Sequence, residues 1–139
     1  MLHAEGDMQF SRFYVFMYPW AEWMTDYLSA TTDGDRVGGA FDCKNGFKVQ
    51  RACQWVSLYD RAGGVGVVMR YTHMPPDVDY ATLLWDRTTP YKKHYAMLWQ
   101  NSDVAEGSTF TFAVRIGFFD AGVEAWQDRA AEIAASLVS

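Results

Sequence analysis

Alternation of apolar and polar residues is the strongest pattern along the chain. Between Thr109 and Phe118 the apolar residues fall on every second position, and Thr, Ala, Arg or Gly stands between them. Successive side chains of a strand point to opposite faces, so a period of two is typical of a strand with one buried face. The pattern predicts a strand over 109–118 with one apolar face, made of Phe110, Phe112, Val114, Ile116 and Phe118.

A second unit runs from Gln54 to Thr72. Two runs rich in β-branched and aromatic residues flank Arg61-Ala-Gly-Gly64, a sequence typical of a hairpin loop. Pairing Asp60 with Val65 makes one face apolar on both strands, and such a face specifies the register. The apolar pairs are then Leu58 with Val67 and Val56 with Met69, and the other face carries Trp55, Ser57, Tyr59 and Arg70.

Further strands are predicted over 9–17, 23–30, 47–51, 80–86 and 94–100. Between them lie breaks rich in glycine, proline and aspartate, at Pro19, 33–35, 38–39, Pro75-Pro76, Pro90 and 106–107. Many short strands separated by turns favour an antiparallel sandwich or barrel over alternating strands and helices. No linker or repeat divides the chain, so we predict one mainly-β domain over residues 1–139, an antiparallel β-sandwich.

The C-terminal tail has a different period. Apolar residues recur at spacings of three and four, with charged residues on the remaining arc, which predicts an amphipathic helix. The apolar positions are Val123, Trp126, Ala130, Ile133 and Leu137. Asp120 is placed to cap the start of this helix, and the apolar stripe is expected to pack on the sheet or on a neighbouring domain.

Composition and charge exclude several classes of function. Half of the 139 residues are hydrophobic, 17% are aromatic and the formal net charge is −5. No basic run is longer than Lys92-Lys93, so the chain lacks the positive surface that nucleic acid requires. Its apolar runs are far shorter than the ~20 residues of a membrane-spanning helix.

The first residues lack the basic and apolar regions of a secretory signal. We therefore expect a soluble protein with no membrane partner. It is expected to be cytoplasmic as the chain stands, and extracytoplasmic if the chain is a fragment of a secreted enzyme.

The two cysteines, Cys43 and Cys53, fit no redox or zinc-binding spacing. If Asn45-Gly46 forms a tight turn, Cys43 faces Lys48, and Cys53 lies beyond the reach of a disulfide. Spacing alone leaves a disulfide open, but this hairpin favours two buried thiols.

No motif of a nucleotide-binding, zinc-protease or serine-hydrolase site is present, and we predict no cofactor or metal. His73 follows a predicted strand, with Asp77 and Asp79 nearby. A histidine beside carboxylates suits acid–base chemistry or metal binding. A lone histidine at a strand end is, however, more often a polar surface group, because catalysis needs geometry that spacing does not show.

The segment Tyr91-Lys-Lys-His-Tyr-Ala-Met-Leu-Trp99 combines aromatic and basic residues. As a strand it places Tyr91, Lys93, Tyr95, Met97 and Trp99 on one face. Aromatic rings stack on the C–H surface of a sugar, while cations and hydroxyls reach its hydroxyl groups or a uronate carboxylate. The alternative is that Tyr95, Met97 and Trp99 belong to the core, where such residues are common.

Another aromatic concentration is Tyr18-Pro-Trp-Ala-Glu-Trp23, in which Glu22 lies between two tryptophans and Pro19 marks an edge or a kink. An exposed tryptophan pair would form a ligand platform, or raise the pKa of the carboxylate enough for acid catalysis. A buried corner with Glu22 facing solvent is the other interpretation.

Four segments together resemble the β-sandwich modules of carbohydrate-active enzymes. They are Trp55-Val-Ser-Leu-Tyr-Asp60, Gly64-Val-Gly-Val, Tyr91-Lys-Lys-His-Tyr95 and Phe110-Thr-Phe-Ala-Val-Arg-Ile-Gly-Phe-Phe-Asp120. In particular they resemble the supersandwich of galactose-mutarotase-like domains and of several polysaccharide lyases and hydrolases. The resemblance covers residues 48–120 and implies a carbohydrate context rather than one reaction.

A complete supersandwich is longer than this chain. The resemblance therefore implies a C-terminal portion of a longer enzyme, a truncated gene product, or a half that completes itself by dimerising. The catalytic histidine and glutamate of the mutarotases are not placed on this sequence, and His73, His94 and Glu22 are catalytic candidates by residue type only.

These observations lead to one main hypothesis, a module that binds or positions a saccharide. Its expected ligand-binding residues are Tyr59, Arg70, Tyr91, Lys93, Tyr95 and Trp99, and its other expected partner is a second copy of the chain or a parent enzyme. The first alternative is a small polysaccharide lyase or sugar epimerase, with a histidine as base, Tyr91 or Tyr95 as acid and Arg70 or Arg87 neutralising a uronate. The second is a structural sandwich that docks a partner through its C-terminal helix.

Overall fold

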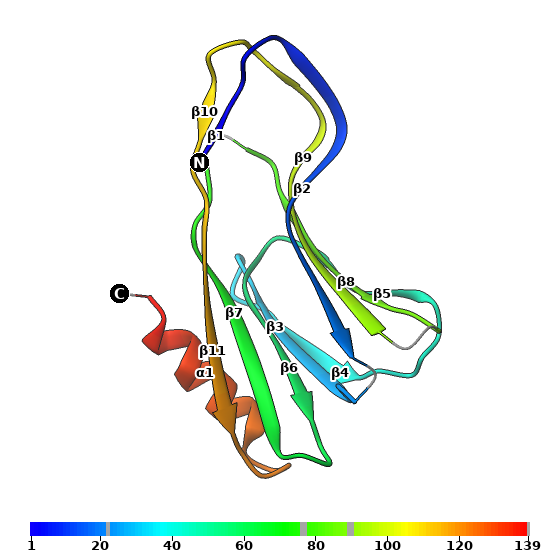
Figure 1. Cartoon of the computed structure of the whole chain (residues 1–139). Helices are drawn as coiled ribbons and strands as arrows, with labels where there is room; N and C mark the ends of the chain where they lie inside the picture. Colours follow the sequence, from blue (N-terminus) through cyan, green and yellow to red (C-terminus); the bar gives the residue numbers. More distant parts are fainter. Residues whose placement is uncertain (22, 76–77, 89–90, 139) are drawn as a thin grey trace.

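The computed structural model describes residues 1–21, 23–75, 78–88 and 91–138. Within those ranges the protein is mainly β, with several antiparallel sheets and one C-terminal helix (Figure 1). The largest sheet has five strands in the order β11 (Ala113–Asp120), β7 (Val65–His73), β6 (Cys53–Asp60), β3 (Asp26–Thr31) and β4 (Arg36–Ala40). A four-stranded sheet follows the order β2 (Met8–Ala21), β9 (Tyr91–Val104), β8 (Ala81–Asp86) and β5 (Gly46–Arg51). The short strands β1 (Leu2–His3) and β10 (Thr109–Phe110) pair with each other.

The β6–β7 hairpin has the predicted register. Asp60 pairs with Val65, Leu58 with Val67, and Val56 with Met69. Gly64 lies in the left-handed region, at a φ of 66°, and its N–H donates to the carbonyl of Asp60 at 2.9 Å. Glycine adopts this φ without strain, so the loop closes in the register that the apolar face requires.

The two larger sheets share one apolar core. Val56, Leu58 and Met69 of the five-stranded sheet belong to the same buried cluster as Leu84 and Ala96 of the four-stranded sheet. Successive residues of a strand point to opposite faces, so each sheet also has an outer face directed away from this core.

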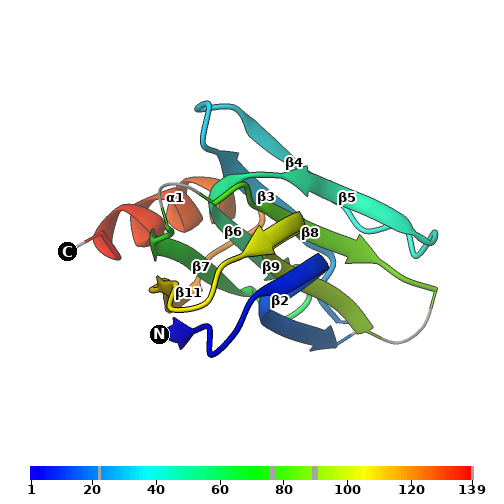
Figure 2. The ribbon, with the colours of Figure 1, turned by 90° about the horizontal axis from the view of Figure 1, so that it is seen from above.

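Helix α1 (Trp126–Ser136) covers the outer face of the five-stranded sheet (Figures 1 and 2). Its side chains Trp126, Ala130 and Ala134 are buried against residues of β6 and β7. The helix and its packing on the sheet are as predicted, but the predicted cap is wrong. Asp120 is the last residue of β11, and the helix begins after Ala125, which makes no side-chain capping bond. No helix within the described residues has the length and apolarity of a membrane span.

The predicted strand over 109–118 is divided. Thr109 and Phe110 form β10, and β11 begins at Ala113, where the register against β7 shifts. Phe110 and Phe112 pack in an apolar cluster near the N-terminus, whereas Phe118 is 72% exposed. Because of this break, the first part of the alternating segment pairs with β1 and the second part joins the five-stranded sheet. The periodic pattern alone does not reveal the division.

Strand β2 continues through Pro19, where the sequence predicts a break. Pro19 pairs with Lys93 of β9, and β2 is an edge strand of its sheet. Proline has no N–H to donate, and an edge strand tolerates this loss on its unpaired side. The alternative that Pro19 marks an edge is therefore confirmed.

The predicted tight turn at Asn45-Gly46 is wrong. β4 belongs to the five-stranded sheet and β5 to the four-stranded sheet, so the chain crosses between sheets at this point. The two cysteines form no disulfide, as the sequence favours. The prediction that both thiols are buried is wrong for Cys43, which is exposed, whereas Cys53 is buried.

Candidate functional site

The outer face of the four-stranded sheet gathers the aromatic and basic residues that the sequence singled out on β9. Lys93 and Tyr95 lie on this face, while His94 and Ala96 point into the core. The predicted alternation is thus confirmed for the described side chains. Tyr91 and Trp99 belong to β9 by their backbone, but their side chains lie outside the described residues.

No described helix or strand packs over this surface (Figure 2). Its described members come from all four strands and the segment after β8, and we call them together the aromatic face. They are Arg12, Tyr14, Phe47, Gln50, Ala81, Leu83, Trp85, Arg87, Lys93, Tyr95 and Gln100.

Two pairs of rings occupy opposite sides of the aromatic face. Tyr14 contacts Tyr95, with ring centroids 4.9 Å apart and planes tilted by 41°. Phe47 contacts Trp85, at 5.7 Å and 37°. In each pair one ring is well exposed, Tyr14 by 43% and Phe47 by 45%. The inner rings hold the outer ones in place, so both outer rings present apolar surface to solvent.

Trp85 is the best anchored ring of the face. Its indole Nε1–H donates to Oδ1 of Asn45 at 2.8 Å. The guanidinium carbon of Arg87 lies 4.8 Å from the ring centroid and Nζ of Lys93 lies 5.7 Å from it. Both cations are within the range of cation–π attraction, which keeps two positive groups beside an aromatic surface.

A hollow of about 140 Å³ crosses the sheet beside Phe47. Arg12 and Gln100 line it on the side of β2, and Phe47 and Gln50 line it on the side of β5, while Leu83 contributes to its apolar wall. The hollow is smaller than the ~300–1,000 Å³ of an enclosed ligand pocket. It therefore suits part of an extended ligand that lies on the sheet.

Tyr59 and Arg70, which the sequence assigns to the same site, lie on the other sheet beneath α1. Tyr59 is fully buried, stacks on Trp126 at 4.9 Å, and donates its hydroxyl to the carbonyl of Ala121 at 2.7 Å. Arg70 donates to the carbonyl of Ala134 at 3.2 Å. The structure does not bring these two residues to the aromatic face.

The two described catalytic candidates, His73 and His94, do not lie on the aromatic face either. His94 is fully buried between the sheets, where Tyr71 Oη lies 2.5 Å from its Nε2 and Met69 Sδ lies 3.1 Å from its Nδ1. These contacts fit the neutral tautomer with its proton on Nδ1, and burial lowers the pKa of His94 to about 3. Burial likewise raises the pKa of Tyr71.

His73 is exposed at the end of β7, on the five-stranded sheet, and Asp79 is exposed as well. Glu22 and Asp77 lie outside the described residues, and Trp23 is 62% exposed. Among the described residues no group of three or more His, Cys, Asp or Glu side chains is arranged to hold a metal ion.

Sequence reasoning missed the partners that complete the aromatic face. Phe47 pairs with Trp85, a contact between strands 38 residues apart that replaces the expected local turn. Ala81, Leu83 and Trp85 occupy the outer positions of β8, but the inner position Leu84 is apolar too, so periodicity distinguishes the faces poorly. The high density of aromatic residues over 80–95 is the only local feature of the sequence that indicates this aromatic face.

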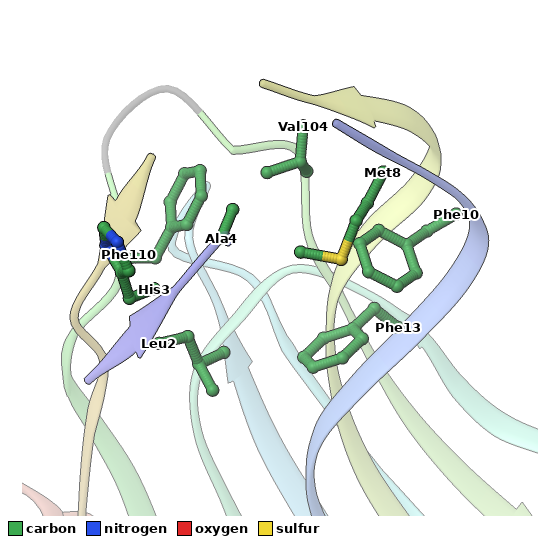
Figure 3. A pocket seen from close by; sticks show the side chains of 8 residues that line it. All are labelled: Leu2, His3, Ala4, Met8, Phe10, Phe13, Val104 and Phe110. Carbon is green, nitrogen blue, oxygen red and sulfur yellow. The ribbon is translucent and has the colours of Figure 1, made fainter. Parts of the chain in front are cut away.

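A second concavity lies at the opposite end of the molecule from the β6–β7 turn (Figures 1 and 3). It measures about 190 Å³, and β1, β10 and the neighbouring ends of β2 and β9 contribute its walls. Leu2, Phe13 and Phe110 point toward it, and His3 at its edge lies 2.9 Å from the hydroxyl of Thr109. Its lining is almost wholly apolar, so it lacks the polar groups that orient a ligand such as a sugar.

Comparison with known proteins gives no relative. No protein-family model, no curated protein and no solved structure matches the chain.

Proposed function

We propose that this chain binds a saccharide on the aromatic face of its four-stranded sheet. The observation that carries the proposal is a hollow on an uncovered sheet, lined by the exposed ring of Phe47, the cation of Arg12 and the amides of Gln50 and Gln100, with a second exposed ring, Tyr14, on the same face. Sugars present apolar C–H patches beside hydroxyl groups, and they are bound by surfaces that offer both kinds of contact.

The rings supply the apolar part of the recognition. Tyr14 and Phe47 have exposed surfaces, and each rests on a second ring that restricts its motion. A ring held in place loses little conformational entropy when a ligand stacks on it, so more of the contact energy contributes to affinity. Packing of this kind supports binding through preformed platforms.

The amides and cations supply the polar part. Gln50 and Gln100 are exposed beside the hollow, and each offers both a donor and an acceptor to sugar hydroxyls. Arg12 adds further donors at the same place. This combination favours a hydroxyl-rich ligand over an apolar one.

The shape favours a chain of sugars over a single ring. From β2 to β5 the sheet spans three inter-strand distances, about 14 Å in all, and the hollow crosses this width. We propose that an oligosaccharide lies across the strands, with Tyr14 near one end and Phe47 near the other.

The resemblance to carbohydrate-active enzymes supports the same class of function. Under this proposal the chain is a sandwich module of the supersandwich type, and it positions a polysaccharide for a parent enzyme or for a second copy of itself. Of the ligand-binding residues that the sequence suggests, Lys93 lies on this face, Tyr95 is buried and supports the Tyr14 ring, and Tyr59 and Arg70 lie beneath the helix.

A glycan microarray on the purified chain tests the proposal, with two variants as a matched pair. Phe47→Ala removes an exposed ring from the aromatic face, and Phe118→Ala removes an exposed ring from the five-stranded sheet. We expect wild type and Phe118→Ala to bind the same saccharides, and Phe47→Ala to bind them about tenfold more weakly. Silence across the array from a folded, monodisperse sample contradicts the proposal, and equal binding by both variants places the ligand elsewhere.

A further inference from the structure

We infer that two copies of this chain associate through the free edge of β11, with the two strands antiparallel about a two-fold axis. β11 is an outermost strand of the five-stranded sheet, and within the described residues β7 is the one strand that pairs with it (Figure 1). The backbone N–H and C=O groups on its other side can therefore pair with a further strand. The aromatic face belongs to the other sheet, so this inference goes beyond the proposed function and does not depend on it.

The other outermost strands of the two larger sheets carry features that discourage pairing. β2 contains Pro19 and two shifts in register. β4 is only five residues long and begins with Arg36. β5 contains Lys48 and Arg51, with a shift in register beside Lys48. Proline, bulges, charged side chains and short length all protect the edge of a sheet from pairing with another chain.

β11 lacks these features over most of its length. Its one shift in register lies between Ala113 and Val114, and the seven residues 114–120 then pair with β7 without interruption. Arg115, the one charged residue between the ends of the strand, donates to the carbonyl of Leu137 at the end of the helix, at 3.5 Å. β11 is thus the least protected outer edge of the two larger sheets.

The exposed apolar side chains of β11 lie on one face of the sheet. Ile116 pairs with Met69 and Phe118 with Val67, and paired residues of neighbouring strands point to the same face. Met69 and Val67 belong to the core between the two larger sheets. On β11, however, Ile116 is 39% exposed and Phe118 is 72% exposed. The apolar inner face of this sheet therefore continues beyond the shared core to the edge, where a further strand would cover it.

The positions of these side chains fit a second copy of the same strand. In a two-fold pairing, residue i of one strand lies opposite residue j of the other, and the reverse also holds. Pairing over all of 114–120 places the axis at the middle residue, Gly117, and sets Ile116 opposite the partner's Phe118. The symmetry produces this contact twice, so both exposed apolar side chains of each copy are covered. A copy of β11 thus supplies the complementary surface for this edge.

A hollow beside Phe118 gives room for the ring of the second copy. Its volume is about 310 Å³, and the apolar side chains that line it include Met24, Val65, Val67 and Phe118 itself. In the pairing about Gly117, the two Phe118 rings lie diagonal to each other, at a separation within the reach of aromatic side chains. Each ring can therefore extend into the hollow of the other copy.

The size of this contact predicts a weak, reversible dimer. A fully covered aromatic side chain buries about 150–250 Å², so each Phe118, at 72% exposure, contributes on the order of 100–200 Å². One strand pair with two exposed apolar side chains on each copy stays below the ~1,200 Å² of a standard interface. We therefore expect a Kd of about 10–100 µM. At the low concentrations of a glycan array the chain is then a monomer, and Phe118→Ala remains a valid control for saccharide binding.

Sedimentation equilibrium of the purified chain, from about 1 µM to about 1 mM, tests the inference. We expect wild type to change from monomer to dimer over this range, without growing further, because a two-fold contact is closed. Phe118→Lys places a like charge on each side of the axis and should raise the Kd about tenfold or more. Phe47→Lys adds the same charge to β5, an edge of the other sheet, and should dimerise as wild type does.

Three results of this experiment contradict the inference. The first is a wild type that stays monomeric at every concentration, even if β11 binds an extended segment of another protein. The second is growth beyond a dimer, which requires a contact without two-fold symmetry. The third is equal dimerisation of Phe118→Lys and Phe47→Lys, which places the contact away from β11.

Disulfide trapping tests the register of the pairing. In a Cys43→Ser background, which removes the exposed native thiol, Ile116→Cys and Phe118→Cys place thiols at positions that lie opposite each other across the axis. We expect a mixture of the two variants to form a covalent dimer in a glutathione redox buffer faster than either variant does alone. Circular dichroism confirms that each variant is folded. Equal or faster linkage of either variant with itself overturns the pairing about Gly117.

Discussion

The two outer sheet faces of this protein carry similar side chains, and the helix covers only one of them. On the five-stranded sheet, Trp55 and Tyr59 lie beneath α1 and are almost completely buried. On the four-stranded sheet, Trp85 and Tyr95 also occupy outer positions, and no described helix or strand packs over them. Tyr95 is nevertheless only 9% exposed, because it lies against Tyr14. Each face has a tryptophan and a tyrosine flanked by basic residues, so their composition does not distinguish core from surface.

The exposure of the rings differs between the two faces. Beneath the helix, Tyr59 and Trp126 are parallel, with planes 1° apart, and Tyr59 also stacks on Phe119. On the aromatic face the pairs are tilted by about 40°, and each includes one exposed ring. The rings beneath the helix fill the space between two layers, whereas each pair on the aromatic face keeps one exposed ring.

The basic residues differ in the same way. Arg70 on the covered face donates to the carbonyl of Ala134, near the C-terminal end of the helix, where a cation is favoured by the helix dipole. Arg87 and Lys93 lie beside the ring of Trp85 instead. The helix therefore buries the aromatic residues of one face, whereas on the other face neighbouring side chains bury Leu83 and Tyr95 and leave Tyr14 and Phe47 exposed.

The largest loss of stability is expected on the five-stranded sheet, where α1 covers its outer face. Trp126→Ala removes the ring that joins α1 to Tyr59 and leaves a cavity between the layers. We expect the free energy of unfolding to fall by about 3–5 kcal/mol, as measured by denaturant titration. Trp23→Ala, at a tryptophan that is 62% exposed, is the control and should change stability by about 0.5 kcal/mol or less. A small loss in Trp126→Ala would mean that the helix does not secure this face.

The interior between the two sheets contains a buried histidine, His94, so the stability of the protein should fall in acid. The pKa of His94 is lowered to about 3 by burial, so between pH 6.5 and pH 3 the unfolded chain binds a proton that the folded chain does not. Stability is therefore full above the unfolded pKa and is lost as the pH falls below about 6.5. From pH 7 to pH 5 we expect a loss of about 2 kcal/mol through this residue.

His94→Gln, which retains an acceptor for Tyr71, should lack this component of the acid response. Denaturant titrations of wild type and variant at several pH values measure the difference between their stabilities. His73→Gln removes an exposed histidine and should leave the pH dependence unchanged. Parallel loss of stability in wild type and His94→Gln would show that His94 is not the group that titrates.

The parts of this fold that sequence predicts are those specified by neighbouring residues. The β6–β7 register follows from a four-residue loop and two apolar alternations, and the structure has the same pairs, including Val56 with Met69. The tail helix follows from its spacing, although it begins only at Trp126, and Val123 lies before it. In each case the pattern and the partner are close together in the chain.

The parts that sequence misses depend on distant partners. Asn45-Gly46 has the composition of a hairpin turn, but β5 pairs with β8 in the other sheet, and only this pairing brings Phe47 to Trp85. Tyr59 shows the same limit, because alternation places it on the correct face but does not show that α1 covers that face. For the candidate site, sequence therefore identifies Lys93 and Tyr95 but not the strands that complete it.

The smallest effect is expected on the aromatic face, at the hydrogen bond between Asn45 and Trp85. Asn45 accepts the indole N–H of Trp85 and holds the ring at one orientation, without lying on the sheet itself. Asn45→Ala removes this contact, so Trp85 and the exposed Phe47 ring that rests on it become more mobile, and Phe47 loses more entropy when a saccharide stacks on it. We expect saccharide affinity to fall by about threefold, with a free energy of unfolding lower by about 1 kcal/mol or less. Gln54→Ala removes an exposed amide from β6 and should change neither quantity. Unchanged affinity in Asn45→Ala would contradict this role of Asn45 and would indicate that Phe47 and the two cations are enough to hold Trp85 in place.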